Sequence, residues 1–232
     1  KVDETVIHET IDAMVSTGMK DAGYEYVVID DCWSKKEFRD SNGTLVPDPE
    51  RFANGIKALA DHAHTSGLKF GIYSDAAELT CAGWPGSFEH EELDATTWAS
   101  WGVDFLKYDY CHAPADQETA IARYTAMGNA LKKTGREILF SLCEWGGRAP
   151  WLWGRDAGGQ MWRATGDVVD AWKPEDLTWG GLTINSAIDL AVYTADYAGP
   201  GGWNDMDMLV VGVRGSGHTA KSGATDEEYR TQ

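Results

Sequence analysis

The stretch that decides the fold is Trp101-Gly-Val-Asp-Phe-Leu-Lys-Tyr-Asp-Tyr-Cys111. Its middle, residues 103–106, is short, mostly apolar and rich in strand-forming residues. Lys107, Asp109 and Cys111 then follow at alternate positions, and alternate residues of a strand point to the same face. A buried strand that ends in a lysine and a carboxylate is costly unless these charges have a partner or a task. We therefore predict that Asp109 is a catalytic nucleophile.

Composition narrows the class of protein. The 232 residues are 43% hydrophobic, enough for a buried core, and carry 37 acidic against 20 basic residues, a formal charge of −17. This charge argues against a nucleic-acid or anionic-membrane partner. We find no apolar run of about 18 residues and therefore expect no membrane span. We also find no signal peptide, and because the chain starts inside a helical pattern we expect its true N-terminus upstream.

The chain repeats one pattern four times: an amphipathic helix, a glycine and an apolar strand. A glycine adopts the left-handed conformation that ends a helix before a strand. The predicted helices are 2–22, 54–66, 91–101 and 116–133, and the strands that follow Gly23, Gly67, Gly102 and Gly135 are 26–31, 69–75, the opening stretch and 138–144. We place Ile7, Ile11, Met14, Val15, Met19 and Ala22 on one face of the first helix. Beyond residue 144 we expect a strand near 161–167, a helix over 183–196, a strand end within 201–211 and a polar tail after Gly212.

Alternating helices and strands predict a parallel sheet, either doubly wound or a (β/α)8 barrel. The first strand is not followed by GxGxxG, which counts against a dinucleotide-binding fold. Acidic residues lie at or just past the strand ends, where a barrel concentrates its active-site groups: Asp30, Asp31, Asp75, Asp109, Glu144, Asp167 and Asp207. We therefore predict a (β/α)8 TIM barrel, with residues 1–232 as a catalytic domain that holds six of eight strands. The first strand would precede Lys1 and the last would follow Gln232.

Three kinds of chemistry fit this cluster. Glycoside hydrolysis needs two carboxyl groups, and Asp109 suits the nucleophile because Lys107 on the same face favours its ionised form. Asp167 suits the acid/base, and tryptophan walls would stack on sugar rings. A metal-dependent barrel enzyme, with three acids around Mg²⁺ and Lys107 as base, is a second hypothesis. A non-catalytic carbohydrate-binding barrel is a third.

The sequence resembles the α-galactosidases of glycoside hydrolase family 27. The motifs run in order across nearly the whole chain: Ile29-Asp-Asp-Cys-Trp33, Asp48-Pro-Glu-Arg-Phe52, Gly67-Leu-Lys-Phe-Gly-Ile-Tyr73, Thr80-Cys-Ala-Gly-Trp-Pro-Gly-Ser87, Trp101 to Asp109, Cys143-Glu-Trp-Gly146, Trp162-Arg163 with Gly166-Asp167, and Gly199-Pro-Gly-Gly-Trp-Asn204 with Asp207-Met-Leu209. Each motif is weak alone, and the set is specific. Met206 stands where many family members have proline.

The resemblance implies a retaining exo-glycosidase that removes terminal α-D-galactosyl residues by double displacement, with no cofactor and no metal. Asp109 matches the nucleophile and Asp167 the acid/base. The family also includes β-L-arabinopyranosidases and α-N-acetylgalactosaminidases, which stay open as alternatives. The substrate would be a galactoside, as a small molecule or a polymer. The β-sandwich domain that usually follows the barrel is expected to lie outside this chain.

The resemblance also assigns the substrate-binding residues. Asp30 and Asp31 match the pair that binds the C4 and C6 hydroxyls, Lys107 contacts the C3/C4 side, and Glu144 and Arg163 lie near the C2 hydroxyl. The pocket-lining positions are Tyr73, Trp145, Asp207 and Met208. Glu144-Trp145 fills the C2 side, which favours galactose over N-acetylgalactosamine, and Asp30 favours a hexose over a pentopyranose.

The resemblance implies a disulfide between Cys81 and Cys111, which would mean a secreted or periplasmic protein. Cys32 matches a cysteine whose family partner lies upstream of this chain. Cys143 is expected to be a buried thiol, because Gln160-Met161 replace the segment that carries its partner in some members.

Overall fold

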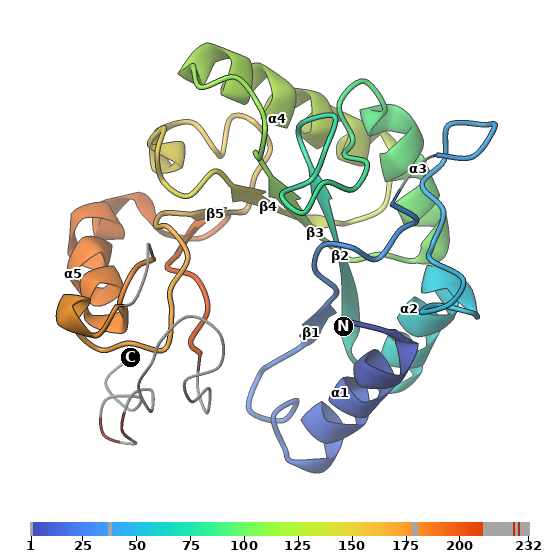
Figure 1. Ribbon diagram of the computed structural model, residues 1–232, viewed down its shortest axis with the longest axis horizontal. Coiled ribbons are helices and arrows are strands. Elements are labelled where there is room, and N and C mark those ends of the chain that lie inside the picture. The colour runs from blue at the N-terminus through green and yellow to red at the C-terminus, as the bar shows by residue number, and fades with distance from the viewer. Residues whose placement is uncertain (1, 37–38, 178–180, 211–224, 226, 228–232) are drawn as a thin grey trace. The chain divides into compact units, whose positions relative to one another are not determined.

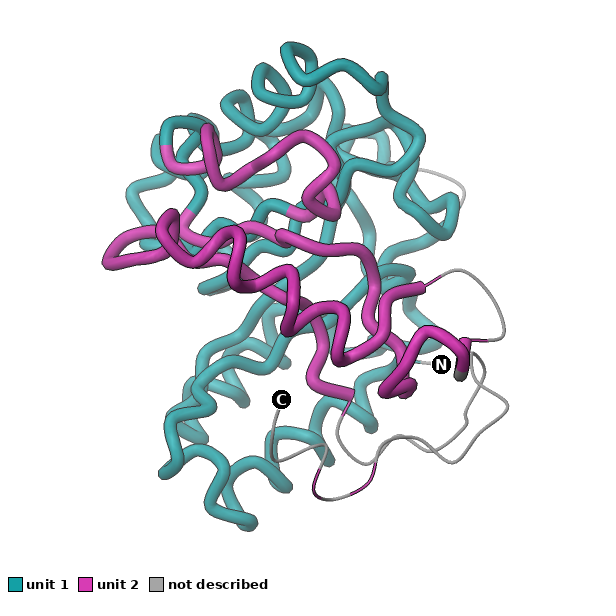
Figure 2. Tube along the Cα trace, turned by 90° about the vertical axis from the view of Figure 1, so that its left-hand side faces the viewer, with its two compact units in different colours: residues 1–142, 156–159 teal, residues 143–155, 160–232 magenta. Residues whose placement is uncertain are grey.

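The computed structural model describes residues 2–36, 39–177, 181–210, 225 and 227. The chain divides into two compact units, which Figure 2 colours separately. Unit 1 comprises residues 1–142 and 156–159, and unit 2 comprises residues 143–155 and 160–232. The predicted polar tail after Gly212 lies almost wholly outside the described residues.

Unit 1 alternates helices with strands, as Figure 1 shows. Its elements are α1 (Glu4–Ser16), β1 (Tyr26–Val28), α2 (Gly55–Thr65), β2 (Lys69–Asp75), α3 (Glu91–Trp101), β3 (Phe105–Asp109), α4 (Gln117–Lys133) and β4 (Leu139–Cys143), whose last residue opens unit 2. Parallel pairing sets Tyr26 of β1 opposite Lys69 and Asp75 of β2 opposite Asp109 of β3. The predicted parallel arrangement is confirmed for these strands.

Unit 2 contains shorter elements. They are η1 (Pro150–Leu152), β5 (Met161–Arg163), η2 (Pro174–Asp176), α5 (Ile184–Thr194), η3 (Ala195–Tyr197) and β6 (Trp203–Asp205). Strands β5 and β6 pair in parallel, with Arg163 opposite Asp205. The expected strand, helix and strand end of this region are therefore confirmed.

Glycine ends the helices where the sequence predicts it. Gly102 follows α3 with φ of 82°, and its N–H bonds back to the last turn of the helix. Gly67, after α2, has φ of 74°. A residue with a Cβ atom would be strained at either place. These turns start β2 and β3, so that both strands end together in the acidic residues.

The predicted first helix is too long. It ends at Ser16 and not at residue 22, because Gly18 turns the chain with a left-handed φ of 82°. Ile7, Ile11 and Met14 are buried as predicted, whereas Val15 and Met19 are each 43% exposed and Ala22 is exposed. The helical spacing of apolar residues therefore extends beyond Ser16, where the helix itself ends.

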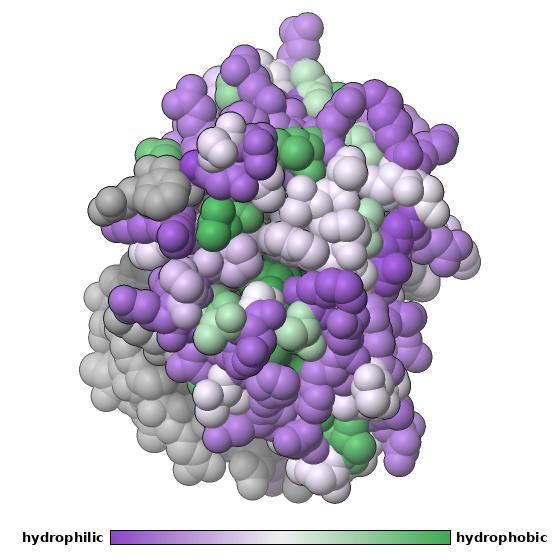
Figure 3. All heavy atoms as spheres, turned by 90° about the vertical axis from the view of Figure 1, so that its right-hand side faces the viewer, coloured by the Kyte–Doolittle hydropathy of each residue, from purple (hydrophilic) through white to green (hydrophobic). Residues whose placement is uncertain are grey.

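The face of the molecule in Figure 3 is largely polar. Hydrophilic residues cover most of the face in Figure 3, and hydrophobic residues are scattered over it. None of the helices formed by the described residues is long and apolar enough to cross a bilayer.

Candidate active site

The strand ends of unit 1 bring together residues from three segments. Asp30 and Asp31 follow β1. Tyr73 and Asp75 lie at the carboxyl-terminal end of β2, and Lys107 and Asp109 lie at that of β3. The parallel register places Tyr73 opposite Lys107 and Asp75 opposite Asp109. The predicted convergence of acidic residues at these strand ends is therefore confirmed within unit 1.

Lys107 joins the first and third of these segments. Its Nζ lies 2.7 Å from Asp30 Oδ2 and 5.3 Å from the centroid of the Tyr73 ring. The Asp30 side chain is 63% exposed, whereas that of Lys107 is 27% exposed. A carboxylate that is ion-paired on one side and open to solvent on the other can accept hydrogen bonds from a polar ligand in place of water.

Asp109 is buried, with only 5% of its surface exposed. Its Oδ2 lies 3.3 Å from Cys81 Sγ, a contact and not a hydrogen bond because a disulfide sulfur carries no proton. Burial is the main reason that the pKa of Tyr73 is raised, and the Asp109 charge and the hydrogen bond to it add to the rise. Tyr73 is therefore a neutral phenol beside the proposed nucleophile.

Asp31 fixes the segment that follows β1. Its two carboxylate oxygens accept the main-chain N–H groups of Cys32 at 2.6 Å and Ala82 at 2.9 Å. Cys32 adopts the left-handed φ of 71°. Burial, followed by the Asp31 charge, raises the pKa of the Cys32 thiol to about 11, so this thiol is protonated at neutral pH.

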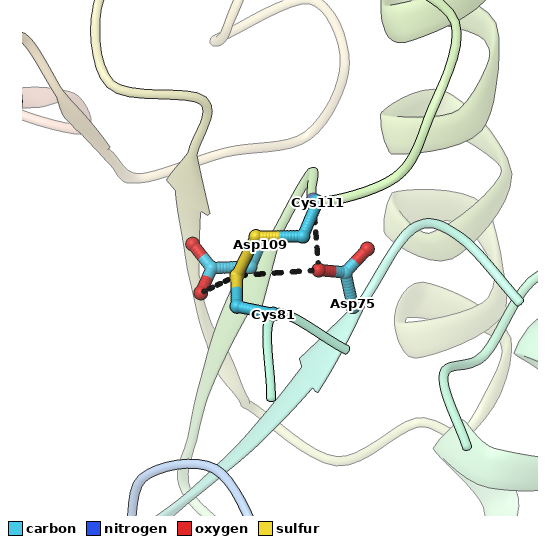
Figure 4. A group of neighbouring side chains, drawn as sticks. All are labelled: Asp75, Cys81, Asp109 and Cys111. Carbon is cyan, nitrogen blue, oxygen red and sulfur yellow. Dashed lines mark hydrogen bonds between the residues drawn. A yellow bond between two sulfur atoms is a disulfide. The ribbon is translucent and has the colours of Figure 1, made fainter. Parts of the chain in front are cut away.

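The disulfide between Cys81 and Cys111 is present, as the resemblance implies. It joins the segment after β2 to the segment after β3, next to Asp75 and Asp109 (Figure 4). Cys143 is a buried thiol, as expected, and Arg163 Nη1 lies 3.7 Å from its sulfur. Cys32 forms no disulfide with another cysteine of this chain, and all four cysteines are described.

The sequence placed Asp75 among the strand-end acids and predicted that those other than Asp109 and Asp167 would accept hydrogen bonds from sugar hydroxyls. Its Oδ2 accepts the Cys111 N–H and its Oδ1 accepts the Ala77 N–H, each at 2.9 Å. Burial raises the pKa of Asp75 to about 8; the Cys111 N–H opposes this rise and the Asp109 charge increases it. The position of Asp75 at a strand end was the signal, and its partners could not be read from the sequence.

In unit 2, Arg163 of β5 holds two of the predicted carboxylates. Its Nη2 lies 2.9 Å from Asp167 Oδ1 and its Nη1 lies 2.6 Å from Asp207 Oδ1. The Arg163 and Asp207 side chains are each only 5% exposed, whereas that of Asp167 is 63% exposed. Burial raises the pKa of Asp207, and Arg163 opposes that rise. Asp167 is thus oriented from one side and open on the other, as a proton donor to a ligand must be.

Glu144 follows β4 and is only 1% exposed. Arg148 Nη1 donates to its Oε2 at 3.2 Å, whereas the buried Oε1 accepts no hydrogen bond from any residue that the structure describes. Burial raises the pKa of Glu144 to about 7, against the lowering effect of Arg148. Sequence reasoning missed Arg148, because residues 144–148 form a turn and the four-residue spacing of paired charges is a signal only on a helix. Trp145 is half-buried, with a left-handed φ of 59°, and Met208 is 54% exposed.

The described residues also include one cluster of metal-type ligand atoms, from Asp75, Cys81, Asp109 and Cys111, all within 4.8 Å of one another. Two of these atoms are disulfide sulfurs, which carry no thiolate charge. The cluster therefore offers two carboxylates, one fewer than the alternative hypothesis of a Mg²⁺ site with three acids requires.

Comparison with known proteins identifies the family. A family model described as alpha galactosidase A matches residues 1–224, and the chain belongs to this family. An alpha-galactosidase A of Cellvibrio japonicus is 47% identical over 231 residues, which make up 99% of this chain and 54% of that protein. An alpha-galactosidase of Oryza sativa is 48% identical over 231 residues, 99% of this chain and 50% of that protein. The chain thus spans about half the length of the curated relatives that it matches.

Solved structures agree. The crystal structure of alpha-galactosidase I from Mortierella vinacea has a TM-score of 0.87 and 44% identity, and the match covers 99% of this chain and 59% of that one. A Saccharomyces cerevisiae alpha-galactosidase solved with raffinose has a TM-score of 0.83 and 41% identity, over 91% of this chain and 50% of that one. Together with the six strands and their helices, these likenesses confirm the fold class as an incomplete (β/α)8 barrel.

Proposed function

We propose that the protein containing this chain is an α-galactosidase that removes terminal α-D-galactosyl residues from oligosaccharides, polysaccharides or glycoconjugates. The observation that carries this proposal is the arrangement at the strand ends of unit 1. A buried carboxylate, Asp109, stands beside a neutral Tyr73, and Lys107 pairs with the exposed Asp30. The family membership and the named activity of the relatives support it.

The proposed mechanism is a double displacement. Asp109 attacks the anomeric carbon while Asp167 gives a proton to the departing glycosidic oxygen. The bond from carbon to the leaving oxygen breaks, and a covalent galactosyl–Asp109 ester forms. Asp167 then takes a proton from water, which attacks the same carbon and releases galactose and free Asp109. The hydrogen bond from Arg163 orients Asp167 and leaves most of the carboxylate exposed to a ligand.

The remaining predicted residues would bind the sugar. Asp30, Asp31 and Lys107 would take the C3, C4 and C6 hydroxyls, and Glu144 and Arg163 the C2 hydroxyl. Among the described residues no donor bonds to the buried Oε1 of Glu144, and in this proposal a sugar hydroxyl takes that acceptor position. Tyr73, Trp145, Asp207 and Met208 would line the pocket. No cofactor takes part in this mechanism.

The first test is hydrolysis of an aryl α-D-galactopyranoside by the natural-length protein and by its Asp109→Asn variant. Turnover by the parent that falls by at least about 10³-fold in the variant is expected, the scale on which enzymes lose rate when a catalytic group is removed. A folded variant that keeps most of its activity would refute the assignment of Asp109.

Asp167 has a separate test. Asp167→Asn should reduce the hydrolysis of raffinose-type substrates, which have poor leaving groups, by about 10²–10⁴-fold, the usual contribution of a general acid. Activated aryl galactosides should lose much less in their first step. An equal loss for both kinds of substrate would argue against the acid role.

Two alternatives of the same family differ in substrate. The β-L-arabinopyranoside and the α-N-acetylgalactosaminide with the same aryl group distinguish them from the proposal. We expect the galactoside to be preferred over both, because Glu144 and Trp145 occupy the C2 side and Asp30 suits a C6 hydroxyl. A folded, natural-length parent that binds galactose and hydrolyses none of the three would favour the carbohydrate-binding alternative.

The disulfide supports a place of action outside the cytoplasm. Cys81 and Cys111 are bonded, and such bonds persist in oxidising compartments. We therefore propose that the protein is secreted or periplasmic, and that residues 1–232 are part of its catalytic barrel domain.

A further inference from the structure

The carboxylate of Asp75 is fully buried at the end of β2, opposite Asp109 of β3. Figure 4 shows the two carboxyl groups on either side of the Cys81–Cys111 disulfide. The mechanism proposed above gives Asp75 no task, although burying an acid is costly. Its contacts explain why an acid is placed there.

Asp75 bonds to two segments of the main chain. Its Oδ1 accepts the N–H of Ala77, which fixes the start of the segment after β2. Its Oδ2 accepts the N–H of Cys111, two residues beyond Asp109. Both bonds measure 2.9 Å. A single rigid carboxyl group therefore connects the segments that follow two neighbouring strands.

The same two segments hold Asp109 at both its main chain and its side chain. The N–H of Ala76 donates to the Asp109 carbonyl at 2.9 Å. Cys111 is bonded to Cys81, whose sulfur lies 3.3 Å from Asp109 Oδ2. A movement of either segment would therefore displace the Asp109 carboxylate.

We propose that Asp75 is a positioning residue that aims the Asp109 carboxylate by bonding the Cys111 and Ala77 main chain. This inference rests on the proposed function, in which Asp109 is the nucleophile. Attack requires the reacting atoms to lie about 3–3.5 Å apart, and a displacement of about 1 Å can cost about 10²-fold in rate. Holding a nucleophile from two sides reduces that displacement.

The chemistry of the side chain explains why an amide would not serve as well. Two main-chain N–H groups need two acceptor oxygens, and a carboxyl group supplies both. Asparagine has the same size but only one oxygen, so its NH₂ group would face one of the two N–H donors. Burial raises the pKa of Asp75 to about 8, and a protonated carboxyl group still has an acceptor site on each oxygen.

The test is Asp75→Asn in the natural-length protein, assayed on an aryl α-D-galactopyranoside. The matched control is Asp104→Asn. Asp104 precedes β3, is largely buried, and its Oδ2 likewise accepts a main-chain N–H across the same strand pair, from Phe70 at 2.9 Å. We expect Asp75→Asn to lower kcat about 10–100-fold with KM within about twofold, and Asp104→Asn to leave both within about twofold.

The thermal midpoint of each variant separates positioning from folding. Asp75→Asn should lose kcat at temperatures well below its midpoint, where the protein is folded. Unchanged kcat in the folded variant, or a loss matched by Asp104→Asn, would overturn the proposal. If Asp75→Asn does not fold, Asp75→Ser keeps one acceptor oxygen, and it must show the same fall in kcat.

A double-mutant cycle gives a second measurement. Cys81→Ser/Cys111→Ser removes the disulfide, which holds the same segments. We expect the Asp75→Asn effect on kcat to be larger in this background, because each link limits the damage from losing the other. Strictly additive effects would contradict the shared role. An inactive parent, or an active Asp109→Asn variant, would refute the proposed function itself, whereas an unchanged Asp75→Asn would refute only this inference.

Discussion

The buried carboxylates at the two ends of the β2–β3 strand pair have opposite surroundings, and their pKa values are shifted in opposite directions. At the amino-terminal end, Asp104 accepts the Phe70 N–H at 2.9 Å and lies 2.7 Å from His64 and 2.6 Å from Arg136. Burial would raise the pKa of Asp104, but these partners outweigh it and hold the pKa below its usual value. At the carboxyl-terminal end, Asp75 faces Asp109, and its pKa is raised.

The difference separates stability from function along a single pair of strands. A carboxylate that is matched by cations contributes to folding, whereas two acids placed in register work against each other. Concentrating like charges is a cost that an active site accepts. We therefore interpret the amino-terminal end as structural and the carboxyl-terminal end as catalytic.

The largest contrast in activity is expected between two lysines in matching settings. Lys107 pairs with Asp30 and lies over the Tyr73 ring, whereas Lys69 at the other end of β2 pairs with Glu25 at 3.0 Å and lies 4.9 Å over the Tyr26 ring. Lys107→Met should lower kcat/KM about 10–100-fold, the value of a charged hydrogen bond to substrate of about 1.5–3 kcal/mol. Lys69→Met should change it less than twofold. Equal effects in a steady-state assay would contradict the comparison.

The next effect is on stability at the catalytic end. The Cys81–Cys111 disulfide spans 30 residues, and its removal should lower the free energy of unfolding by about 3–4 kcal/mol. Denaturant unfolding of Cys81→Ser/Cys111→Ser against the parent measures this. A loss below about 1 kcal/mol would mean that the contacts of Asp75 and Asp31 already fix these segments.

A smaller effect is expected at the structural end. Arg136 bonds through its Nε to the Val103 carbonyl at 2.7 Å and through Nη2 to Asp104. Arg136→Gln should cost about 1–2 kcal/mol of stability, because it leaves part of the Asp104 carboxylate unpaired. It should leave kcat unchanged. A loss of kcat at a temperature where the variant is folded would show that this end also serves catalysis.

A last effect concerns pH. The pKa of Asp75 rises from 3.8 to about 8 on folding, so this group stabilises the protein at low pH and loses that contribution as the pH rises toward 8. The pKa of Asp104 is lowered, so this group stabilises the folded protein at pH values above its usual pKa. It loses that stabilisation only in acid. The thermal midpoint of the parent should therefore fall as the pH rises from 5 to about 7.5. In Asp75→Asn this fall should be smaller by a few degrees. Asp104→Asn should not. Parallel curves for Asp75→Asn and the parent would contradict the raised pKa.

Local sequence signals predicted the strand-end acids better than the hydrogen bonds and the disulfide that hold them in place. The bounds of β2, residues 69–75, are as predicted, because Gly67 and a continuous apolar run define the strand. The strand-end acids followed from these bounds. The first helix was predicted six residues too long because periodicity alone does not reveal the turn at Gly18.

The hydrogen bonds and the disulfide that hold these acids in place join residues that are far apart in sequence. Cys111 is 36 residues from Asp75, and Arg136 is 32 residues from Asp104. No local pattern indicates either bond. The Cys81–Cys111 disulfide came only from the family resemblance, because four cysteines allow three pairings. Arg148 beside Glu144 was also missed, because the two residues lie in a turn, where their spacing carries no helical pairing signal.

The measurement that tests the central claim most directly is the trapping of the covalent intermediate. Asp167→Asn should slow the second step, so that a galactosyl–enzyme accumulates during turnover of an activated aryl α-D-galactopyranoside. Acid quenching, proteolysis and mass spectrometry then locate the sugar. The account predicts a galactosyl group on the peptide that contains Asp109, and none when Asp109 is also replaced by Asn. A galactosyl group on another residue, or a product with inverted anomeric configuration and no trapped sugar, would contradict it.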